Sequence, residues 1–457
     1  MKQKVLAFLV IIICVSFTTY KKYSAKEIQY AEVNASDNAL VLGESNQNGG
    51  GNIGVTSFVD KDEKGNKINS IANGEFPVSY VRMVLHWQKF EPTEGNFDFS
   101  DSNVDAKEFN DYVNSQNNPG LKIQININND SLWATYKNKG DQGTSSPKDL
   151  QANYDQNYGY SKTYYNFVKT VVGHYKNNLE TIVIGNEPIT DFFWLGNPNK
   201  PDDKAKDYLK LFITAKKAIH DVDSNLKVSD GALFGNNIYK LAIYHYCQTG
   251  KTQKAEELYK NSNIKGFYNP SVSACQKVTR ESIEKNPTDK KAFEMVVLGL
   301  KGLGEECPFS GNCTIYEMDD VINFHHYDYS EYLFPIVEYL RETNHGKPVM
   351  LNETGFNDRY VPSCGNDFGA KYMARKLATA VYLKLEPVIW YTKLGTSQET
   401  CGGLIDENGN PKEANRTALK LALKYLNKNF SKISAVTTDD KVERYSFVSN
   451  DGKVDVA

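Results

Sequence analysis

Eight short runs of apolar and β-branched residues alternate with longer amphipathic stretches between residues 53 and 390. Several of these runs are continuously apolar rather than alternating, which is typical of strands buried on both faces of a parallel sheet. The runs are Ile53–Phe58, Ser79–Leu85, Leu121–Ile127, Thr181–Gly185, Lys227–Ser229, Val321–Phe324, Pro348–Leu351 and Pro387–Trp390. The pattern therefore predicts parallel strands joined by helical connections.

The stretches between the runs carry apolar residues at helical spacing. Phe167, Val171 and Val172 mark one helix, and Pro201-Asp202-Asp203 gives the start signal of the next. The apolar face of that helix is formed by Tyr208, Leu211, Phe212, Ala215, Ala218 and Ile219. The apolar face of the last helix is formed by Ala418, Leu421, Ala422 and Leu426. Eight strand–helix units predict an α/β fold of the (β/α)8 or TIM-barrel type, with a doubly wound open sheet as the alternative.

Two segments interrupt or extend this pattern. Residues 231–318 form one long connection, which we interpret as an insertion after strand 5 with a helix around Ala255–Tyr259. Residues 431–457 end in Val442–Val448 and Lys453–Val456, separated by Asn450-Asp451-Gly452, and predict a short C-terminal β-hairpin appendage. The expected catalytic domain is therefore residues 51–430.

The amino-terminal residues have the profile of a targeting segment. A short basic lead, Met1-Lys2-Gln3-Lys4, precedes the uncharged stretch Val5–Phe17, which is short for a membrane-spanning helix. Residues 1–25 are expected to be a secretory signal peptide or an uncleaved amino-terminal anchor, and residues 26–50 a flexible polar lead-in. A secreted or cell-surface location follows from either interpretation, and the anchor would be the chain's only membrane attachment.

Six cysteines remain once such a leader is removed. An even number in an exported protein favours disulfides, although six cysteines allow 15 pairings and free buried thiols are the alternative. Proximity along the chain suggests Cys307–Cys313 and Cys247–Cys275, which leaves Cys364 with Cys401. No Cys-x-x-Cys pair is present, so we expect neither a metal nor another cofactor.

The composition sets broad limits. Hydrophobic residues make up 40% and charged residues 24% of the 457 residues, which excludes wholesale disorder. The 53 Lys and Arg residues nearly balance the 56 Asp and Glu residues, and the net charge of −3 gives no reason to expect a nucleic-acid partner.

Two of the predicted strands end in a glutamate. Glu187 follows the fourth run, in Ile184-Gly185-Asn186-Glu187-Pro188, and Glu353 follows the seventh, in Leu351-Asn352-Glu353-Thr354-Gly355. The carboxyl ends of barrel strands meet at one face, so both side chains are expected to converge there. Two facing carboxylates are what glycosidic bond cleavage requires.

These motifs resemble those of glycoside hydrolase clan A. Asn186-Glu187-Pro188 resembles the clan's acid/base motif, and Glu353-Thr354-Gly355 resembles its nucleophile motif three strands later. Further similar segments, over about residues 50–430, are Tyr80-Val81-Arg82 with Trp87 and Phe90–Phe99, Phe193-Trp194-Leu195-Gly196, His325-His326-Tyr327 and Gly403-Leu404-Ile405-Asp406. The β-xylosidase/iduronidase and cellulase-type families are the most similar. The resemblance implies a retaining O-glycosidase with a poly- or oligosaccharide substrate, Glu187 as acid/base and Glu353 as nucleophile.

Four neighbouring residues fit supporting roles. Arg82 would keep Glu353 ionised, unless it serves only a structural ion pair. Asn186 would donate to a sugar hydroxyl, unless it is a capping residue. Tyr327 would donate to Glu353, and His325 points the same way because it lies two positions earlier on a strand, whereas His326 faces oppositely.

The four tryptophans follow or end predicted strands. They are Trp87, Trp133, Trp194 and Trp390. Indole rings at a barrel mouth commonly stack against sugars, so Trp133, Trp194 and Trp390 are expected to contact substrate, with Trp390 as the floor beneath the cleaved sugar. A catalytically inactive carbohydrate-binding barrel and a transglycosylase remain the alternative functions.

Overall fold

The computed structural model describes residues 53–57, 60–61, 67–115, 120–261, 269–301, 312–356, 368–391, 402–405, 410–430, 432–437, 443–449 and 452–456. All of them belong to one compact unit, Asn48–Ala457. The expected leader, the lead-in and the Cys364–Cys401 pair lie outside the described residues.

All eight predicted runs form strands of one parallel sheet. The strands are β1 (Ile53–Thr56), β4 (Tyr80–His86), β5 (Lys122–Asn128), β7 (Leu179–Ile184), β9 (Lys227–Asp230), β13 (Ile322–His326), β14 (Val349–Thr354) and β15 (Val388–Trp390). The order is β10-β13-β14-β15-β1-β4-β5-β7-β9, with β10 (Leu233–Phe234) parallel to β13. The last strand therefore pairs with the first, and each other strand lies beside its neighbour in the chain. A doubly wound sheet would instead reverse its order in the middle.

The sheet curls until its two ends meet. The Asp320 N–H donates to the Val228 carbonyl at 2.8 Å, and Asp320 Oδ2 accepts from the Val228 N–H at 2.9 Å. The Asn323 amide donates to the Asp230 carbonyl at 3.0 Å. These bonds link the chain at the start of β13 to β9, so the carboxyl ends of the strands surround a common space.

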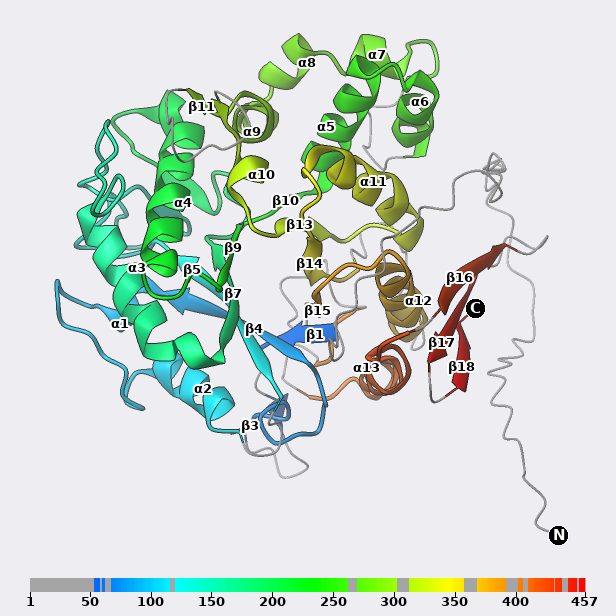
Figure 1. The fold of residues 1–457 in the computed structure, drawn as a ribbon, viewed down its shortest axis with the longest axis horizontal. Helices are drawn as coiled ribbons and strands as arrows, with labels where there is room; N and C mark the ends of the chain where they lie inside the picture. Colours follow the sequence, from blue (N-terminus) through cyan, green and yellow to red (C-terminus); the bar gives the residue numbers. More distant parts are fainter. Residues whose placement is uncertain are drawn as a thin grey trace. The chain divides into compact units, whose positions relative to one another are not determined.

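Helices surround the strands (Figure 1). The helices are α1 (Trp87–Phe90), α2 (Val104–Val113), α3 (Lys162–Tyr175), α4 (Lys204–His220), α5 (Gly235–Gln248), α6 (Thr252–Asn261), α7 (Ala274–Lys277), α8 (Arg280–Glu284), α9 (Pro287–Phe293), α10 (Ile315–Met318), α11 (Leu333–Thr343), α12 (Phe368–Tyr382) and α13 (Glu413–Leu426). Three of them, α3, α4 and α13, are the helices marked by apolar spacing. The structure is therefore of the α/β class. No helix in the described part of the chain is both long enough and apolar enough to span a bilayer.

The first connection differs from the others. Between β1 and β4 the described residues form the antiparallel pair β2 (Asp60–Lys61) and β3 (Lys67–Ile68) and no helix. The other small strands are β6 (Thr144–Ser145), β8 (Trp194–Gly196), β11 (Leu300–Lys301) and β12 (Asn312–Cys313). The expected (β/α)8 alternation is therefore incomplete at its first unit.

The long connection after β9 is largely helical. It holds α5 to α10 among its described residues, and α6 lies where a helix around Ala255–Tyr259 was expected. Cys247 on α5 is disulfide-bonded to Cys275 on α7, as predicted. Cys313 is also disulfide-bonded, and its predicted partner Cys307 lies outside the described residues.

The carboxyl-terminal residues form a small antiparallel sheet. Strands β17 (Glu443–Ser449) and β18 (Gly452–Val456) pair where the hairpin was expected, and β16 (Lys432–Thr437), which was not expected, adds a third strand. Tyr445 is buried against α12, where its hydroxyl lies 3.0 Å from Thr379 Oγ1. The sheet is thus packed onto α12.

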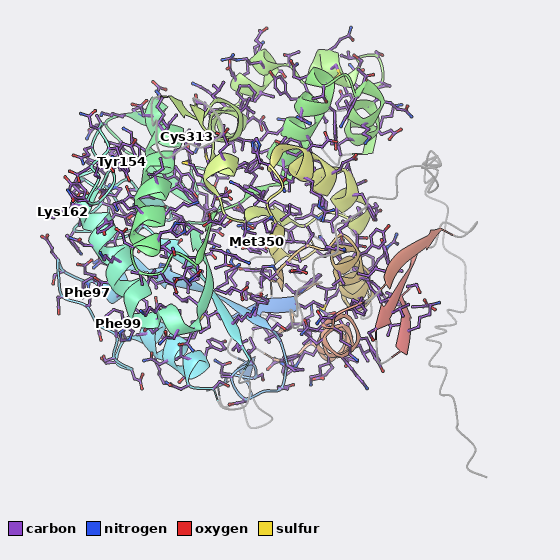
Figure 2. All side chains as sticks on the ribbon, in the orientation of Figure 1. Phe97, Phe99, Tyr154, Lys162, Cys313 and Met350 are labelled. Atoms are coloured by element: carbon purple, nitrogen blue, oxygen red, sulfur yellow. A yellow bond between two sulfur atoms is a disulfide. The ribbon has the colours of Figure 1, made fainter. Side chains whose placement is uncertain are left out.

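A small apolar cluster fills the inside of the curled sheet. Met350, labelled in Figure 2, packs with Val183 and Val321, and the Gln124 amide lies 3.4 Å from the Met350 sulfur. This cluster lies below the strand ends, so it closes the base of the space that the strands surround.

An ion pair ties the segment before β4 to α13. Glu75 accepts from Arg416 at 2.6 Å and from Lys420 at 2.9 Å. Although burial alone would raise the pKa of Glu75, these partners lower it from 4.5 to about 2. The pKa of Glu75 is lower in the folded state than in the unfolded state. The ion pair therefore stabilises the folded state fully above the unfolded-state pKa, and this stabilisation is lost as pH falls through the folded-state pKa.

We expect Glu75→Gln to lower the free energy of unfolding by about 1 kcal/mol at pH 7, since the carboxylate is partly exposed and solvent screens the pair. The difference from the wild type should shrink between pH 4.5 and about 2. Urea denaturation across that range measures it. If the difference in the free energy of unfolding stays constant across this pH range, the ion pair does not cause it.

Candidate active site

Glu187 lies just beyond the carboxyl end of β7, in a left-handed backbone conformation. Its φ is +41°, and Gly185 before it has a φ of +72°. Non-glycine residues with positive φ are uncommon and concentrate at functional sites. This turn redirects the chain so that the Glu187 side chain points across the strand ends, and it leaves only 8% of the residue exposed.

Two buried residues hold this turn in place. The Tyr208 hydroxyl on α4 donates to the Ile184 carbonyl at 2.6 Å and accepts from the Gly231 N–H at 2.9 Å. The Glu187 N–H donates to the Gly231 carbonyl at 2.6 Å. A Cβ at Gly231 would lie 2.9 Å from the Ile184 carbonyl oxygen, so only glycine allows the two strand ends to approach this closely.

Glu353 lies within β14, opposite His325 in the pairing with β13. The register of β14 shifts relative to both neighbouring strands in this region, between Asn323 and His325 on one side and between Leu351 and Thr354 on the other. Such irregularities re-aim side chains near strand ends. Asn352 and Glu353, which are consecutive, both contact His325 as a result.

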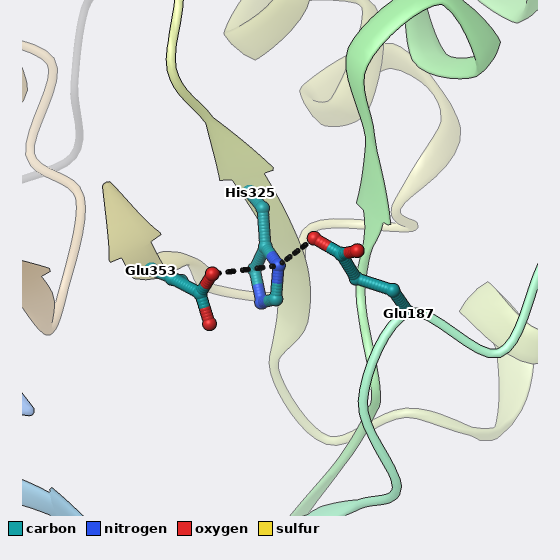
Figure 3. Close-up of side chains that lie close together, drawn as sticks. All are labelled: Glu187, His325 and Glu353. Atoms are coloured by element: carbon teal, nitrogen blue, oxygen red, sulfur yellow. Dashed lines mark hydrogen bonds and ion pairs between the residues drawn. The ribbon is translucent and has the colours of Figure 1, made fainter. Parts of the chain in front are cut away.

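His325 lies between the two glutamates (Figure 3). Its Nδ1 is 2.8 Å from Glu187 Oε1 and 3.8 Å from Glu353 Oε1, and its Nε2 is 2.8 Å from Asn352 Oδ1. One oxygen of each glutamate and a ring nitrogen of His325 all lie within 4.8 Å of one another. The two carboxyl groups therefore face the same small space.

Arg82 on β4 connects the two sides of the site. Its guanidinium donates to Glu353 Oε2, to Asn186 Oδ1 at 2.7 Å and to Asn126 Oδ1 at 3.0 Å. The Asn126 amide donates in turn to the Gly185 carbonyl at 3.1 Å. One buried cation therefore orients Glu353 and also fixes the turn that carries Glu187.

Tyr327, just beyond β13, completes the surroundings of Glu353. Its hydroxyl donates to Glu353 Oε1, the oxygen that faces His325. A Cβ at Gly355 would lie 2.9 Å from the Tyr327 ring, so the ring packs directly on this glycine. The Gly of the Glu353-Thr354-Gly355 motif is thus required by the tyrosine that binds the glutamate.

The two glutamates have opposite pKa shifts. Burial raises the pKa of Glu187 by more than its contact with His325 lowers it, and the charge of Glu353 adds a further rise that Arg82 partly offsets. Burial alone would also raise the pKa of Glu353, but His325, Arg82 and Tyr327 together hold it well below its usual range. At mildly acidic pH the site therefore contains one protonated and one ionised carboxyl group.

The same three residues could offer ligands to a metal ion, but their surroundings do not suit one. One possible ligand atom of each of Glu187, His325 and Glu353 lies within 4.8 Å of the other two. The Arg82 guanidinium already binds Glu353 and would repel a cation there. The donor set fits a proton-transferring carboxyl pair better than a metal centre.

A pocket of about 340 Å³ opens at the carboxyl ends of β4 and β5, and its lining is made of residues other than those described above. Its lining includes His86, Gln88, Lys89, Asp130, Lys137 and Lys139. Side chains alternate along a strand, so His86 and the exposed Val84 lie on the same face of β4 as Arg82. The pocket is within the size range of small-ligand sites.

The tryptophans predicted to contact sugar are largely structural. Trp390 is fully buried, with its N–H donating to the Gly402 carbonyl, and Trp194 is buried with its N–H on the Lys204 carbonyl. Neither presents a ring face to a substrate, which corrects the prediction for both. Trp133 is partly exposed, but its N–H donates to the Glu91 carbonyl and its ring packs edge-on against the buried Trp87. Tryptophans near the strand ends therefore serve mainly in packing and do not form a surface for stacking against sugars.

The structure brings together Glu187, Glu353, Arg82, Asn186, His325 and Tyr327. His326 faces away, with its Nε2 3.2 Å from the Tyr239 hydroxyl, as its strand position predicted. Sequence reasoning missed Asn126 and Asn352, which bind Arg82 and His325. Asn126 lies on the same face of its strand as Gln124, and both are buried. The polar residues that alternate with Ile123, Ile125 and Ile127 along this run were the signal that could have found it.

Comparisons with known proteins found similar structures but no matching sequence. Neither a protein-family model nor the sequence of a curated protein matches this chain. Similar solved structures include a family 39 glycoside hydrolase from the gut symbiont Bacteroides cellulosilyticus WH2, with 15% identity over 88% of this chain and 69% of that one and a TM-score of 0.48. A GH39 β-xylosidase from Caulobacter crescentus is 13% identical over 83% and 71%, with a TM-score of 0.45. The endo-β1,6-glucanase BT3312 is 10% identical over 89% of both chains, with a TM-score of 0.47.

These neighbours are glycoside hydrolases. A similarity of this size does not transfer an activity from one protein to another, so the function has to be argued from the site itself.

Proposed function

We propose that this protein is a glycoside hydrolase of the (β/α)8-barrel type that cleaves O-glycosidic bonds with retention of configuration. Glu353 acts as the nucleophile and Glu187 as the general acid and base. The observation that carries the proposal is the pair of buried carboxyl groups at one edge of the sheet, with opposite pKa shifts and oxygens within 4.8 Å.

The first half-reaction uses both carboxyl groups in their resting states. Ionised Glu353 attacks the anomeric carbon and forms a glycosyl-enzyme ester, while protonated Glu187 donates its proton to the departing glycosidic oxygen. Arg82 and Tyr327 hold Glu353 in place, because each binds one of its two oxygens.

The second half-reaction reverses the role of Glu187. Once Glu353 is esterified its negative charge is gone, and the pKa of Glu187 falls because that charge contributed to raising it. Glu187 then removes a proton from the attacking water, and Glu353 leaves as the carboxylate. His325, at 2.8 Å from Glu187, orients the carboxyl group through both steps.

Retention requires a short separation of the two carboxyl groups. Retaining glycosidases hold their two carboxyl groups about 5–5.5 Å apart, whereas inverting ones leave about 6.5–9.5 Å for a water molecule. We propose the shorter separation here, because one oxygen of Glu187 lies within 4.8 Å of one oxygen of Glu353. Asn186 accepts from Arg82 through its Oδ1, so its Nδ2 remains the group to donate to a sugar hydroxyl.

The substrate is proposed to be a poly- or oligosaccharide whose neighbouring sugar units extend into the pocket beside His86. We further propose that residues 51–430 form the catalytic domain, interrupted by residues 231–318 and followed by the 431–457 sheet. Export to the cell exterior would suit the Cys247–Cys275 disulfide and the amino-terminal profile.

The activity should show a bell-shaped dependence on pH. The rate requires Glu353 ionised and Glu187 protonated, so the acid limb should lie below the usual glutamate pKa and the alkaline limb above it. Arg82→Lys removes the forked contacts, and the acid limb of kcat/KM should rise by about one pH unit because the pKa of Glu353 rises. An unmoved acid limb would show that Arg82 does not control Glu353.

A panel of aryl α- and β-glycosides tests the proposal, with the anomer released from the cleaved substrate followed by NMR. Hydrolysis of at least one glycoside, with the anomeric configuration kept, is the expected result. Release of the inverted sugar would contradict the mechanism. Binding of oligosaccharides without hydrolysis would support the inactive binding protein instead, and transfer to an added acceptor sugar in preference to water would support the transglycosylase.

A further inference from the structure

A fully buried lysine lies behind the nucleophile and outside the mechanism described above. Lys376 on α12 has none of its surface exposed. Its ammonium group donates to three backbone carbonyls, those of His326 and Asp328 at 2.8 Å each and that of Gly355 at 2.9 Å. An ammonium group has three N–H donors, so three acceptors use all of them.

These three carbonyls belong to the two segments that form the nucleophile's surroundings. His326 and Asp328 flank Tyr327, whose hydroxyl binds Glu353. Gly355 lies two residues after Glu353, and the Tyr327 ring packs against it. Lys376 thus joins the residues on either side of Tyr327 to the strand that carries the nucleophile.

Other buried groups make the same turn rigid. The Tyr239 hydroxyl donates to Asp328 Oδ2 at 3.1 Å and lies 3.2 Å from His326 Nε2. The Thr354 hydroxyl donates to the His326 carbonyl at 2.6 Å, and the Tyr372 hydroxyl on α12 donates to the Asp328 carbonyl. The charged groups that face Lys376 are Asp328 and Glu331.

A buried charge is costly unless it is paired and hydrogen-bonded. Asp328 is the nearby countercharge, and the contacts of Lys376 converge on the segment that carries Tyr327. We propose that Lys376 is a positioning residue that acts on the nucleophile through Tyr327, by holding the 326–328 turn against the end of β14. This proposal rests on the proposed glycosidase function.

A double-mutant cycle tests the proposal. Tyr327→Phe removes one donor to ionised Glu353, so the acid limb of kcat/KM should rise by about one pH unit and kcat/KM should fall about tenfold. Lys376→Met has nearly the same size but no donors, and it should give similar changes because Tyr327 is no longer held in place. If Lys376 acts through Tyr327, the double variant should lose about tenfold, whereas independent effects would multiply to about a hundredfold.

Lys371→Met is the matched control, since Lys371 lies on the same helix and is exposed. It should leave both kcat/KM and the acid limb unchanged. If Lys376→Met does not fold, Lys376→Gln, which keeps amide donors near the carbonyls, takes its place and should give about half the shift of the acid limb.

The outcomes separate this proposal from the proposed function. A wild-type protein with no glycosidase activity would refute the function itself. If the wild type is active, either of two results would overturn the positioning role of Lys376. One is a loss of kcat/KM in the double variant equal to the product of the single losses, and the other is an unmoved acid limb in both Lys376 variants.

Discussion

Replacement of Glu353 by Gln should abolish hydrolysis, with a loss on the order of 10⁵-fold in kcat even for aryl glycosides with good leaving groups. The amide cannot form the glycosyl-enzyme ester, because it is a much weaker nucleophile than the carboxylate that Arg82 and Tyr327 hold in place. Steady-state hydrolysis of the best substrate in the aryl glycoside panel measures the loss.

The variant needs two checks, because Glu353 also forms a buried ion pair with Arg82. Removing one partner of a buried pair can destabilise a protein by about 3–5 kcal/mol, so the folded state should be verified by thermal unfolding. Glu257→Gln, at an exposed helical position, is the control and should retain full activity. A folded Glu353→Gln protein with normal turnover would rule out Glu353 as the nucleophile.

Replacement of Glu187 by Ala should affect substrates unequally. For glycosides with poor leaving groups the loss should reach about 10²–10⁴-fold, since proton donation is then needed for bond cleavage. For aryl glycosides with good leaving groups the first step needs little assistance, and the glycosyl-enzyme should accumulate because no base activates water. Added azide should restore turnover and give a glycosyl azide of retained configuration.

The unequal effect distinguishes an acid/base residue from a structural one. A structural defect would slow all substrates alike and would not respond to azide. Equal losses on good and poor leaving groups, together with no azide rescue, would argue against the assignment of Glu187.

Much of the fold could be predicted because buried parallel strands are nearly continuous apolar runs. All eight runs became strands of one sheet, and the curl brings β15 beside β1. The first connection was the exception, because no amphipathic stretch precedes β4 and the pair β2–β3 takes the place of a helix. Strand β16 was also missed, although it directly precedes β17 in the chain and pairs with it antiparallel.

The glutamates could be predicted from their positions after strands, but the contacts that tune them could not. The left-handed turn at Glu187 depends on Gly231, which lies 44 residues later in the chain, and the register shifts around Glu353 depend on both neighbouring strands. The tryptophans also could not be placed correctly from the sequence. Position along a strand does not tell whether an indole faces a cleft or the packed interior, and both Trp390 and Trp194 are buried in the packed interior.

Trapping of the covalent intermediate tests the central claim most directly. A 2-deoxy-2-fluoro glycoside with a good leaving group, built on the sugar that the aryl glycoside panel identifies, should inactivate the enzyme and add one sugar per chain. Peptide mapping by mass spectrometry should place that sugar on Glu353, in the peptide that contains Asn352-Glu353-Thr354. Attachment to Glu187 or to any other residue would contradict the account.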